Sequence, residues 1–115
     1  MDGERTFRRL ALALPSVVEG SHMGAVDFRV NDRIFATLAH AAKGLGTLKL
    51  TAEQQADYLA DGSEYFQAVP GGWGRMGMTL ISLNAPEEVL RGSLHTAYCN
   101  IVEKSAPRRK RSPQA

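Results

Sequence analysis

The sequence predicts an α+β domain in which three helices pack against one antiparallel sheet. Two observations support this class. Apolar residues recur at helical spacing in separate segments, and they alternate with polar residues in short segments between them. The order of helix, strands, helix, strands and helix then favours helices packed on one antiparallel sheet.

The first helix is predicted near the N-terminus. Phe7, Leu10, Ala11 and Leu14 recur at the spacing of one helical face, and Pro15 then ends the helix because proline interrupts its hydrogen bonds. This segment therefore presents one apolar face to a core.

A β-hairpin is predicted next. Residues 20–23 connect the first helix to a strand in which Val26, Phe28 and Val30 alternate with charged residues. The dipeptide at 31–32, Asn-Asp, suits a two-residue turn before a second strand.

A third strand and the second helix follow a loop. Residues 39–46 contain two glycines and no clear period, whereas residues 47–50 read as a strand. Thr51 and Gln54 have the spacing of a capping box, so a helix is predicted from Thr51 to Asp61, before a glycine.

The C-terminal half is predicted to contain two further extended segments and the last helix. Residues 65–69 form a short extended piece before a turn at 70–72, and residues 76–83 form a strand. That strand is apolar on both faces, which suggests a central position in the sheet or a face partly covered by another part of the chain. Asn84 is expected to cap the last helix, whose apolar stripe comprises Leu90, Leu94, Ala97, Tyr98 and Ile101.

Length and composition favour one folded domain. With 115 residues, 43% of them apolar and 23% charged, the chain is typical of a globular protein rather than a disordered one. No apolar stretch approaches the ~20 residues of a spanning helix. The N-terminus lacks the pattern of a secretory signal, and the single cysteine, Cys99, forms no internal disulfide. We therefore expect a cytoplasmic protein without a membrane partner.

The charge is distributed unevenly. Residues 1–106 are predicted as the domain and residues 107–115 as a mobile basic tail, because the apolar pattern stops there. Residues 108–111 supply four of the 14 basic residues, which leaves 10 basic against 12 acidic. A basic surface on the domain must therefore be a local patch, and the tail adds affinity for phosphate without reading bases.

The segment from Gly72 to Gly77 matches the G-x-G-x-x-G pattern of dinucleotide-binding proteins. That fingerprint requires a strand before it and a helix after it, whereas here a strand is predicted to follow. A glycine-rich turn is therefore favoured over a nucleotide site.

No catalytic or metal-binding set is evident. His95 and Cys99 lie four residues apart on the last helix and share a face, but two ligands do not make a metal site. His22 and His40 have no paired ligand spacing. No nucleophile, base and acid occur together, so no catalytic residue, metal or cofactor is expected.

Five residues suggest a basic and aromatic patch. Arg29, Arg33 and Lys49 are expected to project from the sheet opposite the apolar positions, and Trp73 and Arg75 lie beside the glycine turn. Such a patch binds phosphate or an acidic partner. The same residues are also explained by an ordinary solvated sheet face with one packed tryptophan.

Several landmarks occur in a recognisable order and spacing along the chain. They are Leu14-Pro15, His22, Asp27-Phe28-Arg29-Val30, Ile34-Phe35-Ala36, Leu48-Lys49-Leu50, the helix from Thr51 to Leu59, the Trp/Gly-rich turn from Gly72 to Gly77, and Ala97-Tyr98 with Lys104. Together they resemble the MmcQ/YjbR family. The likeness covers about residues 5–105 and leaves out the tail, while Met78 departs from it because many relatives are expected to carry an aromatic residue there.

The resemblance implies a CyaY-like α+β fold. The family is commonly described as DNA-binding through a double-wing arrangement of β-hairpins, although fold alone does not establish function. The leading hypothesis is therefore a non-enzymatic protein that binds DNA weakly, with Arg29, Arg33, Lys49 and Arg75 on phosphates and Trp73 shaping the surface.

An alternative hypothesis involves no nucleic acid. In it the domain is a protein-interaction or small-ligand-binding module. His22, Lys49, Trp73 and Arg75 would then converge on a pocket or on an acidic protein partner. The slight negative charge of the body favours this alternative.

Overall fold

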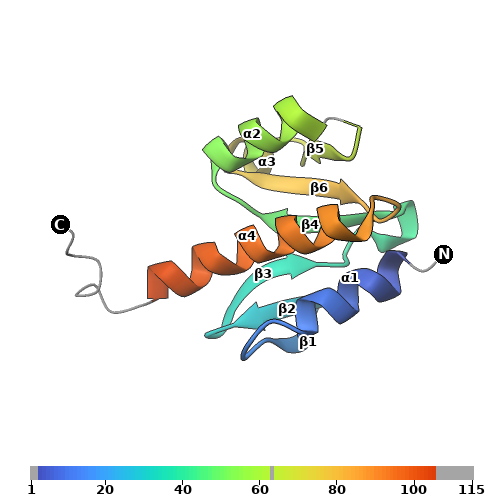
Figure 1. Cartoon of the computed structure of the whole chain (residues 1–115). Coiled ribbons are helices and arrows are strands. Elements are labelled where there is room, and N and C mark those ends of the chain that lie inside the picture. The colour runs from blue at the N-terminus through green and yellow to red at the C-terminus, as the bar shows by residue number, and fades with distance from the viewer. Residues whose placement is uncertain (1–2, 63, 106–115) are drawn as a thin grey trace.

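The computed structural model describes residues 3–62 and 64–105, and it contains one six-stranded antiparallel sheet with helices packed against it (Figure 1). The strands lie in the order β1-β2-β3-β4-β6-β5. The strands are β1 (Val18–His22), β2 (Ala25–Val30), β3 (Arg33–Thr37), β4 (Leu45–Lys49), β5 (Phe66–Ala68) and β6 (Met78–Ser82). The helices are α1 (Gly3–Leu12), α2 (Ala52–Gly62), α3 (Gly72–Arg75) and α4 (Glu87–Ser105), with a 3-10 turn η1 (Ala41–Lys43). The predicted α+β class is confirmed; the predicted tail lies outside the described residues.

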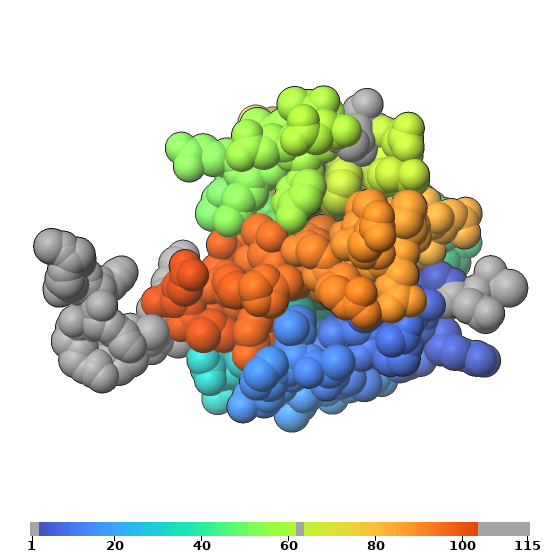
Figure 2. Space-filling view, viewed as in Figure 1, coloured from blue at the N-terminus to red at the C-terminus, as the bar shows by residue number. Residues whose placement is uncertain are grey.

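The core lies between the sheet and the helices. Figure 2 shows α4 between α1 and α2 on this side of the molecule. Phe7 of α1 and Phe28 of β2 are fully buried, with ring centroids 6.1 Å apart in an edge-on arrangement. Leu48, Ile81 and Leu94 are equally inaccessible, and burying each such side chain stabilises the fold by roughly 1.5–3 kcal/mol. None of the helices in the described ranges has the length and apolar character needed to cross a membrane.

Several predicted local signals are present in the structure. α1 ends at Leu12, ahead of Pro15. The β2–β3 turn has positive φ angles at both central residues, 54° at Asn31 and 65° at Asp32, as type I′ hairpin turns require. The capping box of α2 also forms, and its reciprocal bonds with Gln54 fix the point where the chain leaves the sheet.

The edge strand β1 was not predicted. It pairs with β2 along its whole length, and the turn between them has positive φ angles at Met23 (54°) and Gly24 (83°). Both faces of β1 are largely exposed, so its sequence carries no apolar alternation. The segment predicted as a simple connection is therefore a strand and a hairpin turn.

Three further boundaries differ from the prediction. A fourth, short helix, α3, precedes β6, which begins at Met78 rather than residue 76 because Gly77 has a φ of 114°. The predicted loop 39–46 contains the η1 turn, and its last two residues belong to β4, which runs from Leu45 to Lys49 rather than over residues 47–50. Asn84 is not the cap of α4, since the carbonyl of Pro86 accepts the first helical bonds. The predicted central position of the apolar strand is correct: β6 lies between β4 and β5.

Candidate functional site

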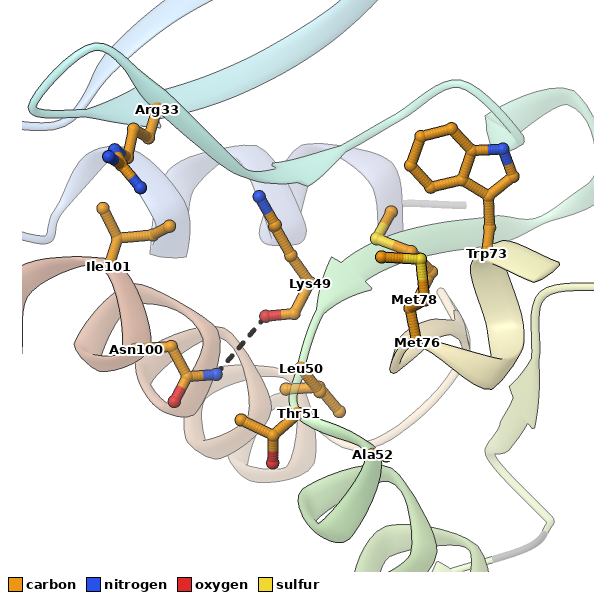
Figure 3. A pocket seen from close by; sticks show the side chains of 10 residues that line it. All are labelled: Arg33, Lys49, Leu50, Thr51, Ala52, Trp73, Met76, Met78, Asn100 and Ile101. Atoms are coloured by element: carbon orange, nitrogen blue, oxygen red, sulfur yellow. Dashed lines mark hydrogen bonds between the residues drawn. The ribbon is translucent and has the colours of Figure 1, made fainter. Parts of the chain in front are cut away.

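A cavity of about 380 Å³ lies at the end of the sheet where β4 finishes and β3 and β6 begin (Figure 3). Two of its residues are cationic, and none of the ten is acidic. The lining residues are Arg33, Lys49, Leu50, Thr51, Ala52, Trp73, Met76, Met78, Asn100 and Ile101. The cavity therefore combines positive charge with an apolar and aromatic wall.

Lys49 is placed in this cavity by strand pairing and by the start of α2. It is the last residue of β4 and lies opposite Met78 of β6. The capping box at Thr51 then turns the chain into α2 directly after the strand. The Lys49 side chain is exposed and points across the cavity in Figure 3.

Trp73 is placed by α3, whose glycines allow a close approach to neighbouring backbone. A Cβ at Gly74 would collide with the carbonyl oxygen of Val69, and a Cβ at Gly77 would collide with that of Leu50. The second and third glycines of the G-x-G-x-x-G pattern therefore serve packing. A helix of only four residues begins at the first glycine, and a strand follows the last.

Gln55 of α2 fixes the position of α3. Its buried amide nitrogen lies 3.0 Å from the carbonyl oxygen of Gly74, 3.0 Å from that of Met78 and 3.2 Å from Oγ1 of Thr79. One side chain thus ties α2 to both α3 and β6, and the exposed indole of Trp73 stands on a firmly held helical turn.

Asn100 of α4 closes the other side of the cavity. Its Nδ2 donates to the carbonyl oxygen of Lys49 at 3.4 Å (Figure 3). Its side-chain amide also pairs with that of Gln54 through bonds of 2.7 and 3.0 Å. α2, β4 and α4 are therefore joined at the cavity. Neither Asn100 nor Gln55 had been identified from the sequence as part of a site.

Comparison with known proteins identifies the family. The model of the YjbR family matches residues 12–100, which is most of the chain. The chain belongs to the YjbR family. The crystal structure of the Deinococcus radiodurans protein DR2400, described as a DUF419 domain, matches with a TM-score of 0.71 and 17% sequence identity, over 90% of this chain and 81% of that one. At that identity the likeness shows the fold alone. No curated protein sequence matches this chain.

In this YjbR domain, three of the predicted patch residues meet in the cavity. Arg33, Lys49 and Trp73 all line it. Arg75 does not, but it lies on the same short helix as Trp73, and its guanidinium folds back toward Gly72, where an added Cβ would be 3.7 Å from it. Arg75 is therefore close to Trp73 in sequence but is not one of the residues that line the cavity.

Arg33 lies on a different face of the sheet from the one that simple alternation predicts. A β-bulge shifts the β2–β3 register, so that Phe28 pairs with Ala36 but Arg29 pairs with Ile34. Arg33 consequently lies opposite buried Val30, on the helix side of the sheet rather than the open side. It projects beside the end of α4.

Arg29 lies outside the cavity and is held by Asp27. Its Nε donates to Asp27 Oδ1 at 2.7 Å and its terminal nitrogen to Oδ2 at 3.1 Å, while the Asp27 side chain is only 2% exposed. The hydrogen bond and charge of Asp27 raise the pKa of Arg29 above its ordinary value. This arginine therefore neutralises a buried carboxylate.

His22 is also remote from the cavity. It ends β1 and pairs with Ala25, whereas the opposite end of β2 leads to Arg33. The four residues of the predicted ligand pocket are thus not all brought together, because His22 lies at the other end of the hairpin. Met76 and Met78 contribute to the wall instead, and Met78, the predicted departure from the family pattern, lies opposite Lys49.

The His95–Cys99 pair shares a helix face as predicted, with Cys99 Sγ 3.5 Å from His95 Nε2. Within residues 3–62 and 64–105, no group of three potential metal ligands occurs around this pair or elsewhere. Burial raises the pKa of the Cys99 thiol, and the charge of Glu103 raises it further. The thiol is therefore kept protonated, which is the opposite of an activated nucleophile.

Proposed function

We propose that this chain is a non-enzymatic protein that binds DNA weakly and without sequence preference. Arg33, Lys49 and Arg75 contact phosphates, and Trp73 stands beside them. The observation that carries the proposal is the cavity, in which two cations and an exposed indole meet without any carboxylate among the lining residues. In this proposal the β2–β3 hairpin, which supplies Arg33, acts as one wing of the expected double-wing arrangement.

The ion-pair pattern of the domain supports this assignment. Elsewhere on the surface, Arg8, Arg9, Arg29 and Arg91 are each paired with a carboxylate. Arg33, Lys49 and Arg75, like Arg5 and Lys43, have no carboxylate within 4.0 Å among the residues that the structure describes, and of these cations Arg33 and Lys49 line the same cavity. Unpaired cations that cluster at one site attract phosphate, even on a body whose net charge is slightly negative.

The sequence beyond α4 supports the same partner. Ile101 lines the cavity, α4 ends at Ser105, and the run of four basic residues begins at position 108. The tail is therefore attached close to the cavity in sequence. Its charge adds affinity for a polyanion that is sequence-independent.

The proposal is tested by the salt dependence of DNA binding. The full-length chain with residues 108–111 changed to glutamine isolates the contribution of the cavity. Fluorescence anisotropy of labelled duplex DNA is measured between about 50 and 200 mM salt. Three phosphate contacts predict a slope of about −2.7 in log K against log salt, or a roughly 40-fold loss of affinity.

Lys49→Ala is the decisive variant, and Lys43→Ala is its matched control. Both remove one exposed lysine, but Lys43 lies in η1, before β4, whereas Lys49 ends that strand at the cavity. Lys49→Ala should lower the magnitude of the slope by about 1, and Lys43→Ala should leave it unchanged.

Equal effects of the two changes, or no binding once the tail is neutral, would refute the proposal. Equal affinity for polyglutamate would refute DNA as the partner and favour an acidic protein.

A further inference from the structure

We infer that the ligand of this cavity is single-stranded DNA, and that an unpaired base stacks on the indole of Trp73. The inference rests on the proposed function and names the form of DNA that the site accepts. It follows from three observations: how Trp73 is exposed, how α3 is held, and how cations and apolar groups are arranged around the cavity.

Trp73 is 67% exposed and Met76 is 72% exposed, although both are large apolar side chains. This exposure does not come from a loosely packed segment. Gly74 and Gly77 bring α3 against the backbone of Val69 and Leu50, and Gln55 bonds to the carbonyl of Gly74. A rigid turn therefore presents an aromatic surface to solvent, which is the arrangement that stacking on a base requires.

The cationic side chains and the apolar side chains occupy different parts of the cavity. In Figure 3 the Lys49 side chain lies between Arg33 on one side and Met76, Met78 and Trp73 on the other. A nucleotide has the same division into an anionic phosphate and an aromatic base. The arrangement thus places phosphates near Arg33 and Lys49 while a base contacts Trp73, with the polarisable methionine sulfurs as its neighbours.

The stacking contact distinguishes single strands from duplex. In a duplex each internal base is stacked on its neighbours, so its face is unavailable to a protein side chain, whereas unpaired bases present theirs. The cavity volume of about 380 Å³ is also within the ~300–1,000 Å³ typical of sites that enclose a small ligand group. An inorganic phosphate or an acidic peptide would use the cations and leave the indole without a partner.

The experiment uses the intrinsic fluorescence of Trp73, which is the only tryptophan in the chain. Full-length protein is titrated with oligothymidylate of about 12 nucleotides, with an abasic strand of equal length, and with a blunt duplex. Oligothymidylate should quench Trp73 and bind roughly 5- to 160-fold more tightly than the abasic strand, the ratio expected for one stacked base. The duplex should bind without quenching.

Trp73→Ala and its control Met23→Ala complete the test, with binding measured by anisotropy of labelled strands. Each removes an exposed apolar side chain, but Met23, 92% exposed, lies in the β1–β2 turn. Trp73→Ala should reduce the affinity for oligothymidylate to that of the abasic strand, and Met23→Ala should not. Equal affinity for both strands without quenching, or equal quenching by the duplex, overturns the stacking inference while DNA binding stands. Binding to none of the three ligands overturns the proposed function itself.

Discussion

Replacing Gln55 by leucine removes the hydrogen bonds with which α2 holds α3 and, through α3, Trp73. The Gln55 amide nitrogen carries two hydrogens and lies within 3.0–3.2 Å of three acceptors, on Gly74, Met78 and Thr79. Leucine has a similar volume and leaves α2 helical, so the substitution tests these bonds and not the packing of the helix.

The expected loss of stability is moderate because every acceptor keeps another bond. The carbonyl of Gly74 still accepts from the Gly77 amide at 3.0 Å, and that of Met78 accepts from the Val69 amide at 3.0 Å. The Thr79 hydroxyl still donates to the Gly77 carbonyl at 2.8 Å. The loss is therefore two hydrogen bonds of about 0.5–1.5 kcal/mol each, or about 1–3 kcal/mol in all. In a domain of this size that lowers Tm by roughly 4–12 °C.

Thermal unfolding followed by circular dichroism measures this loss. Gln67→Leu is the control, because Gln67 lies exposed on β5 and makes none of these bonds. Gln55→Glu should be more damaging than Gln55→Leu, because it directs a carboxylate at three oxygens without supplying a donor. A Gln55→Leu variant as stable as the Gln67→Leu control would show that these bonds do not hold α3. A Gln55→Glu variant more stable than Gln55→Leu would contradict the assigned orientation of the amide.

Two further predictions concern the packing of α3 and the state of the thiol. Gly74→Ala should destabilise the domain by about 1–3 kcal/mol, because the added methyl group collides with the Val69 carbonyl. Gly92→Ala in α4 should instead stabilise the domain by about 0.5–1 kcal/mol, because its methyl group meets nothing within 4 Å and alanine favours a helix over glycine. Both changes are measured by chemical unfolding, and equal signs would contradict the packing argument. The pKa of the Cys99 thiol is raised above its ordinary value in the folded state, chiefly by burial, so the folded protein keeps this proton to higher pH than the unfolded chain does. The free energy of unfolding should therefore decrease as the pH rises above the pKa of the thiol in the unfolded chain. Cys99→Ser should remove that decline, and rapid alkylation of folded Cys99 near neutral pH would contradict the raised pKa.

The elements that the sequence predicted correctly are those whose signals are local. The spacing of Phe7 and Leu10 reports a helix that buries one face, and the capping box of Thr51 and Gln54 involves residues three positions apart. β1 carried no such signal, because an edge strand exposed on both faces needs no apolar alternation. Its pairing with β2 is made by backbone groups, which any sequence provides.

The site was only partly predictable for the same reason. Lys49 and Trp73 were identified as candidates by residue type, and the structure places both in the cavity. The roles of Gln55 and Asn100 at the cavity were not predictable from the sequence, because their hydrogen-bond partners lie 19 to 51 residues away along the chain. Arg29 was expected on the open face of the sheet as a phosphate-binding residue. In the structure its guanidinium is bound by the buried carboxylate of Asp27.

By itself the sequence determined the α+β class, the family resemblance, the positions of the longer helices and the β2–β3 hairpin. These depend on periodicity, capping and turn residues that act over a few positions. The tertiary structure alone decided which polar side chains meet and which way they face. A single β-bulge moved Arg33 to the cavity, and the register of the hairpin kept His22 away from it. Such outcomes depend on pairing between distant segments, so one inserted residue changes the face on which a side chain lies.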